Sequence, residues 1–268
     1  MKITIVTISY NSEKHIRQTI SSVLSQSFTN IEYIIVDGLS TDTTMKIVGE
    51  YKDKIDLIIS EQDAGMYDAY NKGAAAATGD YILYLNSDDY LRGDDAVETM
   101  CRRIAEYESP PKLLAGQANV VIDDVIIPDW RIPYSAKLTE KFDPMLPSLL
   151  IHKDIYTNIL FDSNCKIGGD TDFYLRLRKL ELFEISFVPI LMTCFRMGGV
   201  STNTQKIGYY ALEKEMFLYN LTGDVSIKRL LLNYTRGMTK MLCMRILGNR
   251  NYYLKIVYPL YLIRRKML

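Results

Sequence analysis

Four short apolar runs rich in β-branched side chains constrain the fold of this chain more than any other feature. They span residues 2–8, 31–36, 55–60 and 80–85, and helix-like segments at 13–26, 42–52 and 66–77 separate them. Buried strands of a parallel sheet are apolar on both faces, and parallel neighbours need a long crossover connection, usually a helix. The alternation predicts an α/β fold with a mostly parallel, Rossmann-like central sheet flanked by helices.

The second half of the chain has a less regular pattern. A helix is predicted at 94–107 and a strand at 113–122, whereas 123–152 contains four prolines and predicts loops with short pieces. Beyond it we expect a helix at 171–180 and strand pieces near 185–188 and 191–196. Further helices are predicted at 205–222, 226–247 and 251–266. No run approaches the roughly 18 apolar residues of a membrane-spanning helix.

The composition is that of a folded protein in a reducing compartment. Hydrophobic residues make up 48% of the 268 residues, which is enough to bury a core. The four cysteines are scattered, without the close pairs of a zinc site or redox motif, and indicate reduced thiols. No signal-peptide pattern precedes the first strand, so we expect a cytoplasmic location.

Charge is distributed unevenly along the chain. Residues 225–268 hold 10 Lys or Arg and no Asp or Glu, whereas the first 224 residues hold 22 basic and 32 acidic residues. We therefore expect a main domain at 1–224 and a basic amphipathic helical extension at 225–268. The extension is typical either of a segment lying on the anionic inner face of the cell membrane or of a helical cap with a solvated basic face. No recognition motif indicates a nucleic-acid partner.

Polar and acidic side chains follow each of the four apolar runs. In an open parallel sheet ligands bind beyond the carboxyl ends of the strands, so these side chains are expected at one rim. Neither a G-x-G-x-x-G after the first run nor a P-loop motif is present. An acidic rim that binds phosphate needs a cation, and carboxylates suit Mg²⁺ or Mn²⁺. Asp88 is the candidate ligand, with Asn86 and Asp89 beside it; alternatively, Asp88 and Asp89 only cap a turn.

Six segments in order resemble the glycosyltransferase family 2 enzymes, which have the GT-A fold. The resemblance covers about residues 1–200 and is carried by TISYNS (7–12), VDGLSTDTT (36–44), DAGMYDAYNKG (63–73), ATGDYILYLNSDD (77–89), GGDTDFYLRL (168–177) and FRMGGVS (195–201). It implies a metal-dependent, inverting transfer of a sugar from a nucleotide-sugar donor, usually a UDP-sugar.

The resemblance also implies a donor site. Base and ribose binding carries over to Thr7, Tyr10, Asn11 and Asp37. The family's Asp-x-Asp motif corresponds to Asn86-Ser87-Asp88, which makes Asp88 the metal ligand and Asn86 and Ser87 donor-binding candidates. The amide of Asn86 stands where the first Asp is usual, so Asp89 is a second candidate for the metal. Gly38 replaces a second acidic residue, so Asp37 alone is expected to face the base.

The catalytic base of the family lies in an acidic motif at the start of a helix. That motif corresponds to Gly168-Gly169-Asp170, so Asp170 is the expected base and Asp172 the alternative. Gly169 replaces the usual Glu. Considered alone, Asp170 is more typical of a helix N-cap, and only the four other matching motifs favour its assignment as the base.

Three further residues are candidates for donor binding. Tyr67 and Asn71 lie four apart on the predicted 66–77 helix and share a face, which the resemblance places near the donor. A core-facing Tyr67 is the alternative. Arg196 precedes paired glycines and is a candidate for binding diphosphate, or else part of an ordinary turn.

The leading hypothesis is an inverting glycosyltransferase at the cytoplasmic membrane face. It would extend a lipid-linked or surface-polysaccharide precursor of the O-antigen or capsule type; a soluble acceptor is the variant within the same class. The departures at Asn86 and Gly169 keep open a non-catalytic sugar-nucleotide-binding protein of the same fold. A nucleotidyltransferase is disfavoured, because TISYNSE lacks a glycine-rich basic loop.

Overall fold

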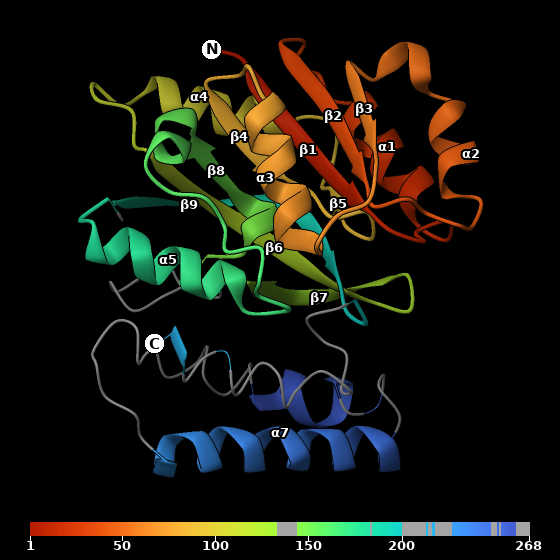
Figure 1. Ribbon diagram of the computed structural model, residues 1–268, viewed down its shortest axis with the longest axis vertical. Coiled ribbons are helices and arrows are strands. Elements are labelled where there is room, and N and C mark those ends of the chain that lie inside the picture. Colours follow the sequence, from red (N-terminus) through yellow and green to blue (C-terminus); the bar gives the residue numbers. More distant parts are fainter. Residues whose placement is uncertain are drawn as a thin grey trace.

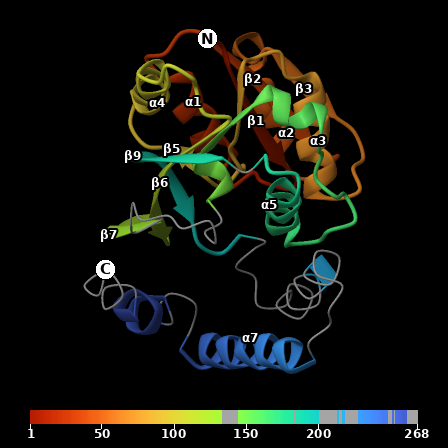
Figure 2. The same cartoon turned by 90° about the vertical axis from the view of Figure 1, so that its left-hand side faces the viewer.

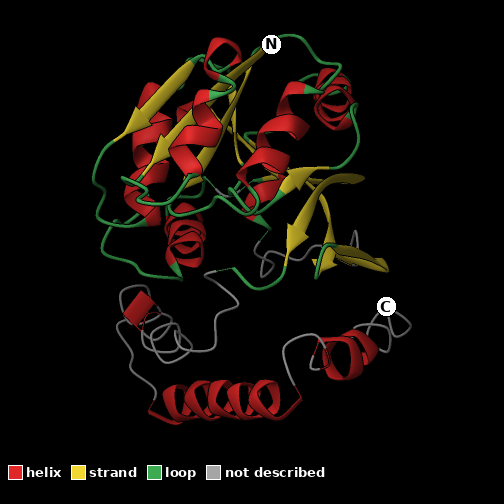
Figure 3. Cartoon of the chain, turned by 90° about the vertical axis from the view of Figure 1, so that its right-hand side faces the viewer, coloured by secondary structure: helices red, strands yellow, loops and turns green. Residues whose placement is uncertain are grey.

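The protein consists of an α/β body and a separate long helix, as the computed structural model shows (Figure 1). The structure describes residues 1–132, 144–182, 184–199, 213, 216–217, 227–247, 251 and 253–260. Strands lie in the middle of the body with helices on either side (Figure 3). The long helix lies beyond one end of the body in two perpendicular views (Figures 1 and 2).

One mixed sheet forms the centre of the body. Its order is β3-β2-β1-β4-β8-β6-β9-β5, with β7 paired to β6. The part β3-β2-β1-β4 is parallel throughout, as predicted, whereas β8 pairs antiparallel with both β4 and β6, and β6 pairs parallel with β9. The strands are β1 (Ile3–Ser9), β2 (Ile31–Asp37), β3 (Leu57–Ser60), β4 (Tyr81–Tyr84), β5 (Tyr90–Leu91), β6 (Leu113–Ile122), β7 (Val125–Ile132), β8 (Leu149–His152) and β9 (Ile185–Arg196).

Helices cover both faces of the sheet because neighbouring strand residues point to opposite sides. Val6 of β1 packs in a core with α3 and α5, whereas Ile5 packs in a second core with α1 and α4. The α/β expectation is therefore confirmed. The helices are α1 (Ile16–Leu24), α2 (Thr44–Gly49), α3 (Met66–Ala76), α4 (Ala96–Ala105), α5 (Gly169–Lys179) and α7 (Ile227–Leu247), with short 3-10 turns at Lys52–Lys54, Leu146–Ser148 and Lys153–Thr157.

Two predictions in the second half were wrong. The segment predicted as loops contains β7 and β8, and the two predicted strand pieces are one strand, β9. Proline misled the prediction in both places, because it is tolerated in strands at edges and bulges. Pro128 lies in β7, which among the strands that the structure describes pairs with β6 alone, and Pro189 lies where the β6–β9 register shifts.

The C-terminal segment is helical where it is described. Helix α7 confirms the prediction over 226–247, and a π-helical turn, η6 (Tyr253–Val257), lies within the predicted 251–266 helix. Most of the predicted 205–222 helix lies outside the described residues. Among the helices that the structure describes, none combines the length and apolar character needed to cross a membrane. The division of the chain between residues 224 and 225 stays a prediction.

Candidate active site

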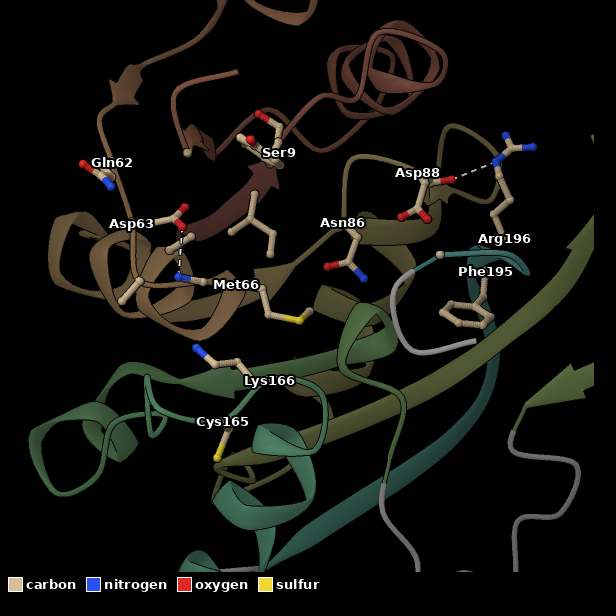
Figure 4. Close-up of a pocket in the computed structure, with 17 residues that line it drawn as sticks. Ser9, Gln62, Asp63, Met66, Asn86, Asp88, Cys165, Lys166, Phe195 and Arg196 are labelled. Atoms are coloured by element: carbon tan, nitrogen blue, oxygen red, sulfur yellow. Dashed lines mark hydrogen bonds between the residues drawn. The ribbon is translucent and has the colours of Figure 1, made fainter. Parts of the chain in front are cut away.

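A cavity of about 560 Å³ opens at the carboxyl ends of β1, β2, β3 and β4. This is the rim expected from the sequence, and the volume is in the usual range for small-ligand sites. Figure 4 shows side chains from separate parts of the chain pointing into it. The lining residues are Ile8, Ser9, Tyr10, Gly38, Gln62, Asp63, Ala64, Gly65, Met66, Ala69, Asn86, Asp88, Cys165, Lys166, Phe195, Arg196 and Gly199.

Asp88 is the carboxylate that the β4 end presents to this cavity (Figure 4). Burial raises the pKa of Asp88, and the nearby positive charge of Arg196 opposes that rise. Gly199 covers it closely: a Cβ built on Gly199 would lie 2.6 Å from Asp88 Oδ2. The absence of a side chain at position 199 thus leaves this oxygen its place at the cavity wall.

Asp89 has the opposite orientation. Asp89 is only 1% exposed, and it does not border the cavity. One oxygen accepts the Arg196 backbone N–H at 2.9 Å, and the other accepts the Asn86 amide at 3.2 Å. Burial and then the charge of Asp88 raise the pKa of Asp89 well above its ordinary value. The two adjacent carboxylates therefore have different tasks: Asp88 faces the ligand space and Asp89 holds the turn.

Asn86 connects this turn to the aromatic core. It borders the cavity, and its Oδ1 accepts a hydrogen bond from the Tyr70 hydroxyl at 2.6 Å. Ser87 points elsewhere, because its hydroxyl lies 2.7 Å from that of Ser12 and its carbonyl accepts the Thr19 hydroxyl at 2.9 Å. The turn after β4 is thus held from both sides.

The residues present fit a divalent cation bound largely by non-protein oxygens. Within the described part of the chain, no three His, Cys, Asp or Glu side chains gather into a metal site of their own. Mg²⁺ and Mn²⁺ are commonly held by one or two carboxylates, with waters and substrate phosphates completing the shell. Asp88, beside the Asn86 carboxamide, supplies such a single carboxylate.

Arg196 lies behind Asp88 rather than across the cavity from it. Arg196 is only 7% exposed. The guanidinium donates to the Asp88 carbonyl at 3.0 Å and to Gln18 Oε1 at 2.7 Å, and it forms an ion pair with Asp124. These partners take up three of the five guanidinium N–H groups and direct them to protein oxygens. The geometry makes Arg196 a clamp on the 88–89 backbone.

Two residues expected to bind the nucleotide lie one layer below the cavity surface. Asp37 is fully buried, and its carboxylate accepts hydrogen bonds from the hydroxyls of Ser9, Ser40 and Ser60 and from the Ser40 backbone. Thr7 is also fully buried, with its hydroxyl 3.1 Å from that of Tyr33. Both shape the rim from beneath.

Tyr10 and Asn11 form the outer lip of the same rim. Tyr10 borders the cavity and is 63% exposed, as suits a ring that stacks on a ligand. Asn11 has a positive φ of 49°, a conformation that Asn tolerates better than most residues. Its Oδ1 accepts the Thr41 backbone N–H at 2.8 Å and so links the loops after β1 and β2.

Asp63 is a cavity residue that the sequence reasoning did not select. A Cβ on Gly38 would lie 2.5 Å from Asp63 Oδ2, so the carboxylate fills the space left by the missing side chain. Its Oδ1 accepts the Gly65 backbone N–H at 3.0 Å, while no described residue donates to Oδ2. Burial raises the pKa of Asp63. The sequence signal that could have identified Asp63 was Gly38, which stands where the family has a second acidic residue.

The first turn of α5 carries Asp170 and Asp172, with different surroundings. Asp172 is buried and accepts a hydrogen bond from Arg176 Nε at 2.6 Å; burial raises its pKa, and the Arg176 charge opposes the rise. Asp170 accepts the Thr171 backbone N–H at 2.8 Å. After burial, the charge of Asp170 is the next cause raising the pKa of both Tyr67 and Tyr70, so its carboxylate lies near these two side chains.

Tyr67 and Asn71 hold the chain in front of α5 against α3. The Tyr67 hydroxyl donates to the Ile167 carbonyl, and Asn71 bonds both the N–H and the carbonyl of Phe161 at 2.9 and 2.8 Å. A Cβ on Gly169 would lie 2.8 Å from three atoms of the Tyr67 ring. The ring therefore occupies the space above position 169, and neither Tyr67 nor Asn71 borders the cavity.

Lys166 is the second cavity residue that the sequence reasoning missed. It lies opposite the β4 end in Figure 4, and its side chain is exposed. The Glu213 carboxylate holds this loop by accepting the backbone N–H groups of Lys166, Ile167 and Gly168. No local pattern marks Lys166, because its position depends on a contact 47 residues along the chain.

The comparisons with known proteins agree with this geometry. The model of Glycosyl transferase family 2 matches residues 4–169, and the chain belongs to that family. The succinoglycan biosynthesis protein ExoO of Rhizobium meliloti (strain 1021) is 32% identical over 189 residues, which cover 69% of this chain and 50% of ExoO. The chain spans only part of the curated relatives it matches, 16%, 56% and 17% of the length of the first three.

Two solved structures have the same fold. S. aureus TarS 1–349 in complex with UDP-GlcNAc has a TM-score of 0.65 at 20% identity, covering 96% of this chain and 76% of that one. The mannosyltransferase PcManGT from Pyrobaculum calidifontis, in complex with GDP-Man and Mn²⁺, has a TM-score of 0.60 at 15% identity, covering 89% and 70%. The GT-A fold expectation is confirmed, and the fold is the one expected for a member of Glycosyl transferase family 2.

Proposed function

We propose that this protein transfers a sugar, with inversion, from a nucleoside diphosphate sugar to a hydroxyl of a glycan or lipid-linked acceptor. The donor is a UDP-hexose or UDP-N-acetylhexosamine, and the product belongs to a surface polysaccharide. The observation that carries the proposal is the Asp88 carboxylate in a cavity at the strand ends of a family 2 chain. The UDP-GlcNAc complex of TarS and the polysaccharide role named for ExoO support the donor and the product class.

The nucleoside would bind at the β1–β3 side of the cavity. Tyr10 offers an exposed ring for stacking, and the outward oxygen of Asp63 can accept an N–H of the base. We propose Asp63 for this contact rather than Asp37, because the Asp37 oxygens are already saturated by protein donors.

The diphosphate would bind between the β4 end and the loop before α5. Asp88 would hold Mg²⁺ or Mn²⁺, with Asn86 at its side and Lys166 as the facing cation. When bound, the cation neutralises the charge that develops on the departing diphosphate. Arg196 keeps Asp88 in place through its bond to the Asp88 carbonyl.

Asp170 is the proposed base. It takes the proton of the acceptor hydroxyl while that oxygen bonds to the anomeric carbon, and the bond to the diphosphate breaks with its electron pair leaving on the diphosphate. Asp172 is the weaker candidate, because Arg176 already neutralises it at 2.6 Å.

The test is calorimetric titration of UDP into the full chain with Mn²⁺ and with chelator. Asp88→Ala is expected to abolish the metal-dependent part of binding. Asp94→Ala, an exposed acid beyond the cavity, is the matched control and should bind like the wild type. Asp170→Asn should keep UDP binding and lose transfer. Absence of UDP binding under all conditions would contradict the UDP-sugar proposal.

A second candidate is a non-catalytic sugar-nucleotide-binding protein of the same fold. Two observations favour it: an amide at position 86, and the Tyr67 ring over Gly169 where the family carries Glu. An assay for metal-dependent hydrolysis of UDP-sugars, or for transfer of the sugar to an acceptor, separates the two functions. Either activity would establish the enzyme. Binding of UDP-sugars with neither hydrolysis nor transfer would establish the non-catalytic binding protein.

We also propose that the protein works at the inner face of the cell membrane. The basic segment 225–268 is suited to anionic lipid, and a lipid-linked acceptor would be presented there.

A further inference from the structure

Helix α7 turns its apolar side to solvent. Six of its exposed large hydrophobic residues recur at helical spacing, namely Ile227, Leu231, Tyr234, Met238, Leu242 and Ile246, whereas the exposed Leu232 lies beside this stripe. At 100° per residue, the first five fall within roughly 80° of one another. A helical cap on the body would bury this side, as the alternative interpretation of the sequence requires. These residues are instead 43–71% exposed.

The same segment carries a strong single-sign charge. Residues 225–268 hold 10 basic and no acidic residues. On α7, the half-buried Lys240 lies on the side opposite the apolar stripe, whereas the exposed Arg245 lies at the C-terminal end of the stripe itself. A long basic side chain at that place can reach lipid headgroups while its stem stays with the apolar residues.

We propose that the apolar stripe of α7, the six residues named above, lies in the headgroup boundary of an anionic lipid bilayer, parallel to its surface. An amphipathic helix of this kind is stabilised at a membrane surface by burial of its apolar side chains and by attraction of its basic side chains to anionic lipid. A bilayer satisfies both features at once. A second copy of this segment would bury the stripe but would also bring two basic segments together.

The placement of α7 suits access to an acceptor held in that bilayer. Strands β1 and β2 run from the end of the body near the N-terminus toward the end beyond which α7 lies (Figures 1 and 2). The cavity is at those strand ends, so it is on the α7 side of the sheet. Membrane contact stands without catalysis; only its connection to a lipid-linked acceptor rests on the proposed function.

The test is co-sedimentation of the full chain with vesicles of phosphatidylcholine alone or with added phosphatidylglycerol. We expect binding to the anionic vesicles that weakens with added salt. The double variant Leu231→Gln, Leu242→Gln should lower the partition coefficient about tenfold or more, because two apolar contacts are lost without a change of charge. The matched control replaces Leu57 and Leu180, which are 39% and 50% exposed on the body, with Gln and should bind like the wild type.

Three outcomes would overturn the proposal. They are equal binding to neutral vesicles, no loss in the α7 variant, and absence of vesicle binding at low salt. If the wild type is also a dimer in solution and the α7 variant a monomer, the stripe is an interface between copies. UDP binding without vesicles is measured on the same proteins and should be unchanged. Failure of the lipid proposal is thereby separated from failure of the proposed function.

Discussion

Replacement of Gly199 by alanine tests whether Asp88 holds a divalent cation. The added Cβ would lie 2.6 Å from Asp88 Oδ2, and ordinary contact begins at 3.4 Å, so the carboxylate must retreat by about 0.8 Å. Metal–ligand distances in a working site vary by only about 0.2 Å. Since the oxygen that moves is the end of a side chain, the displacement should affect metal binding far more than folding.

The expected result is metal-dependent UDP binding weakened about 10- to 100-fold, the usual effect of disturbing the support of a ligand. Gly198→Ala is the matched control. Gly198 has φ of 117°, and its Cβ would meet nothing within 4 Å, so alanine there strains the backbone without touching Asp88. That strain should cost about 1–2 kcal/mol of unfolding free energy and leave UDP affinity unchanged.

Calorimetric titration with Mn²⁺ and with chelator, beside thermal unfolding, separates the two effects. Unchanged Mn²⁺-dependent affinity in Gly199→Ala would refute the reasoning. An equal loss of affinity in chelator would show that the substitution acts on the cavity and not on the metal.

Two other predictions concern contacts in and around the site, and a third concerns Glu32 near the start of β2, at the end of the strands away from the cavity. Asp63→Asn should weaken UDP binding about 10- to 100-fold, the value of a hydrogen bond to a charged acceptor, as measured by titration. Gly169→Ala should cost about 1–3 kcal/mol in chemical denaturation, because its Cβ meets the Tyr67 ring, and much less in a Tyr67→Leu background. For Glu32, burial favours a higher pKa, but hydrogen bonds from Thr4, Thr78 and Lys2 lower it to about 2 from 4.5. Its stabilisation is therefore complete above about pH 4.5 and lost as the pH falls toward 2, so Glu32→Gln should cost about 2 kcal/mol at neutral pH and less in acid.

Each of these predictions has a control and a contradicting result. For Asp63, the control is Asp68→Asn, which lies outside the cavity lining, and equal losses in both would argue against a specific contact. For Gly169, additive costs in the double variant would show that the ring is not the obstacle. For Glu32, the exposed Glu106→Gln should follow the wild type, and a constant gap between Glu32→Gln and wild type at all pH values would exclude the titration.

Much of the fold could be predicted because a buried strand shows as a local run of apolar residues in the sequence. Strands β1, β2 and β4 are buried on both faces, so they read as continuous apolar runs, and their parallel order follows from the helices between them. The polar residues after each run also had to meet at one rim. No comparable pattern predicts strand β8, because the strand is short. Its position between β4 and β6 depends on pairing with segments that are distant in the chain.

The sequence by itself indicated the family and that the polar segments after four strands meet at one rim, whereas the tertiary structure decided which side chains border the cavity and what each one contacts. Asp88 and Asp89 are adjacent and chemically alike, yet only Asp88 faces the cavity, because the Arg196 backbone captures Asp89 from 107 residues away. Asp37 and Asp63 divide in the same way, since three serine hydroxyls saturate one while Gly38 leaves room for the other. The role of each carboxylate depends on which donors bond to it in the folded protein. Those donors come from parts of the chain that only folding brings together.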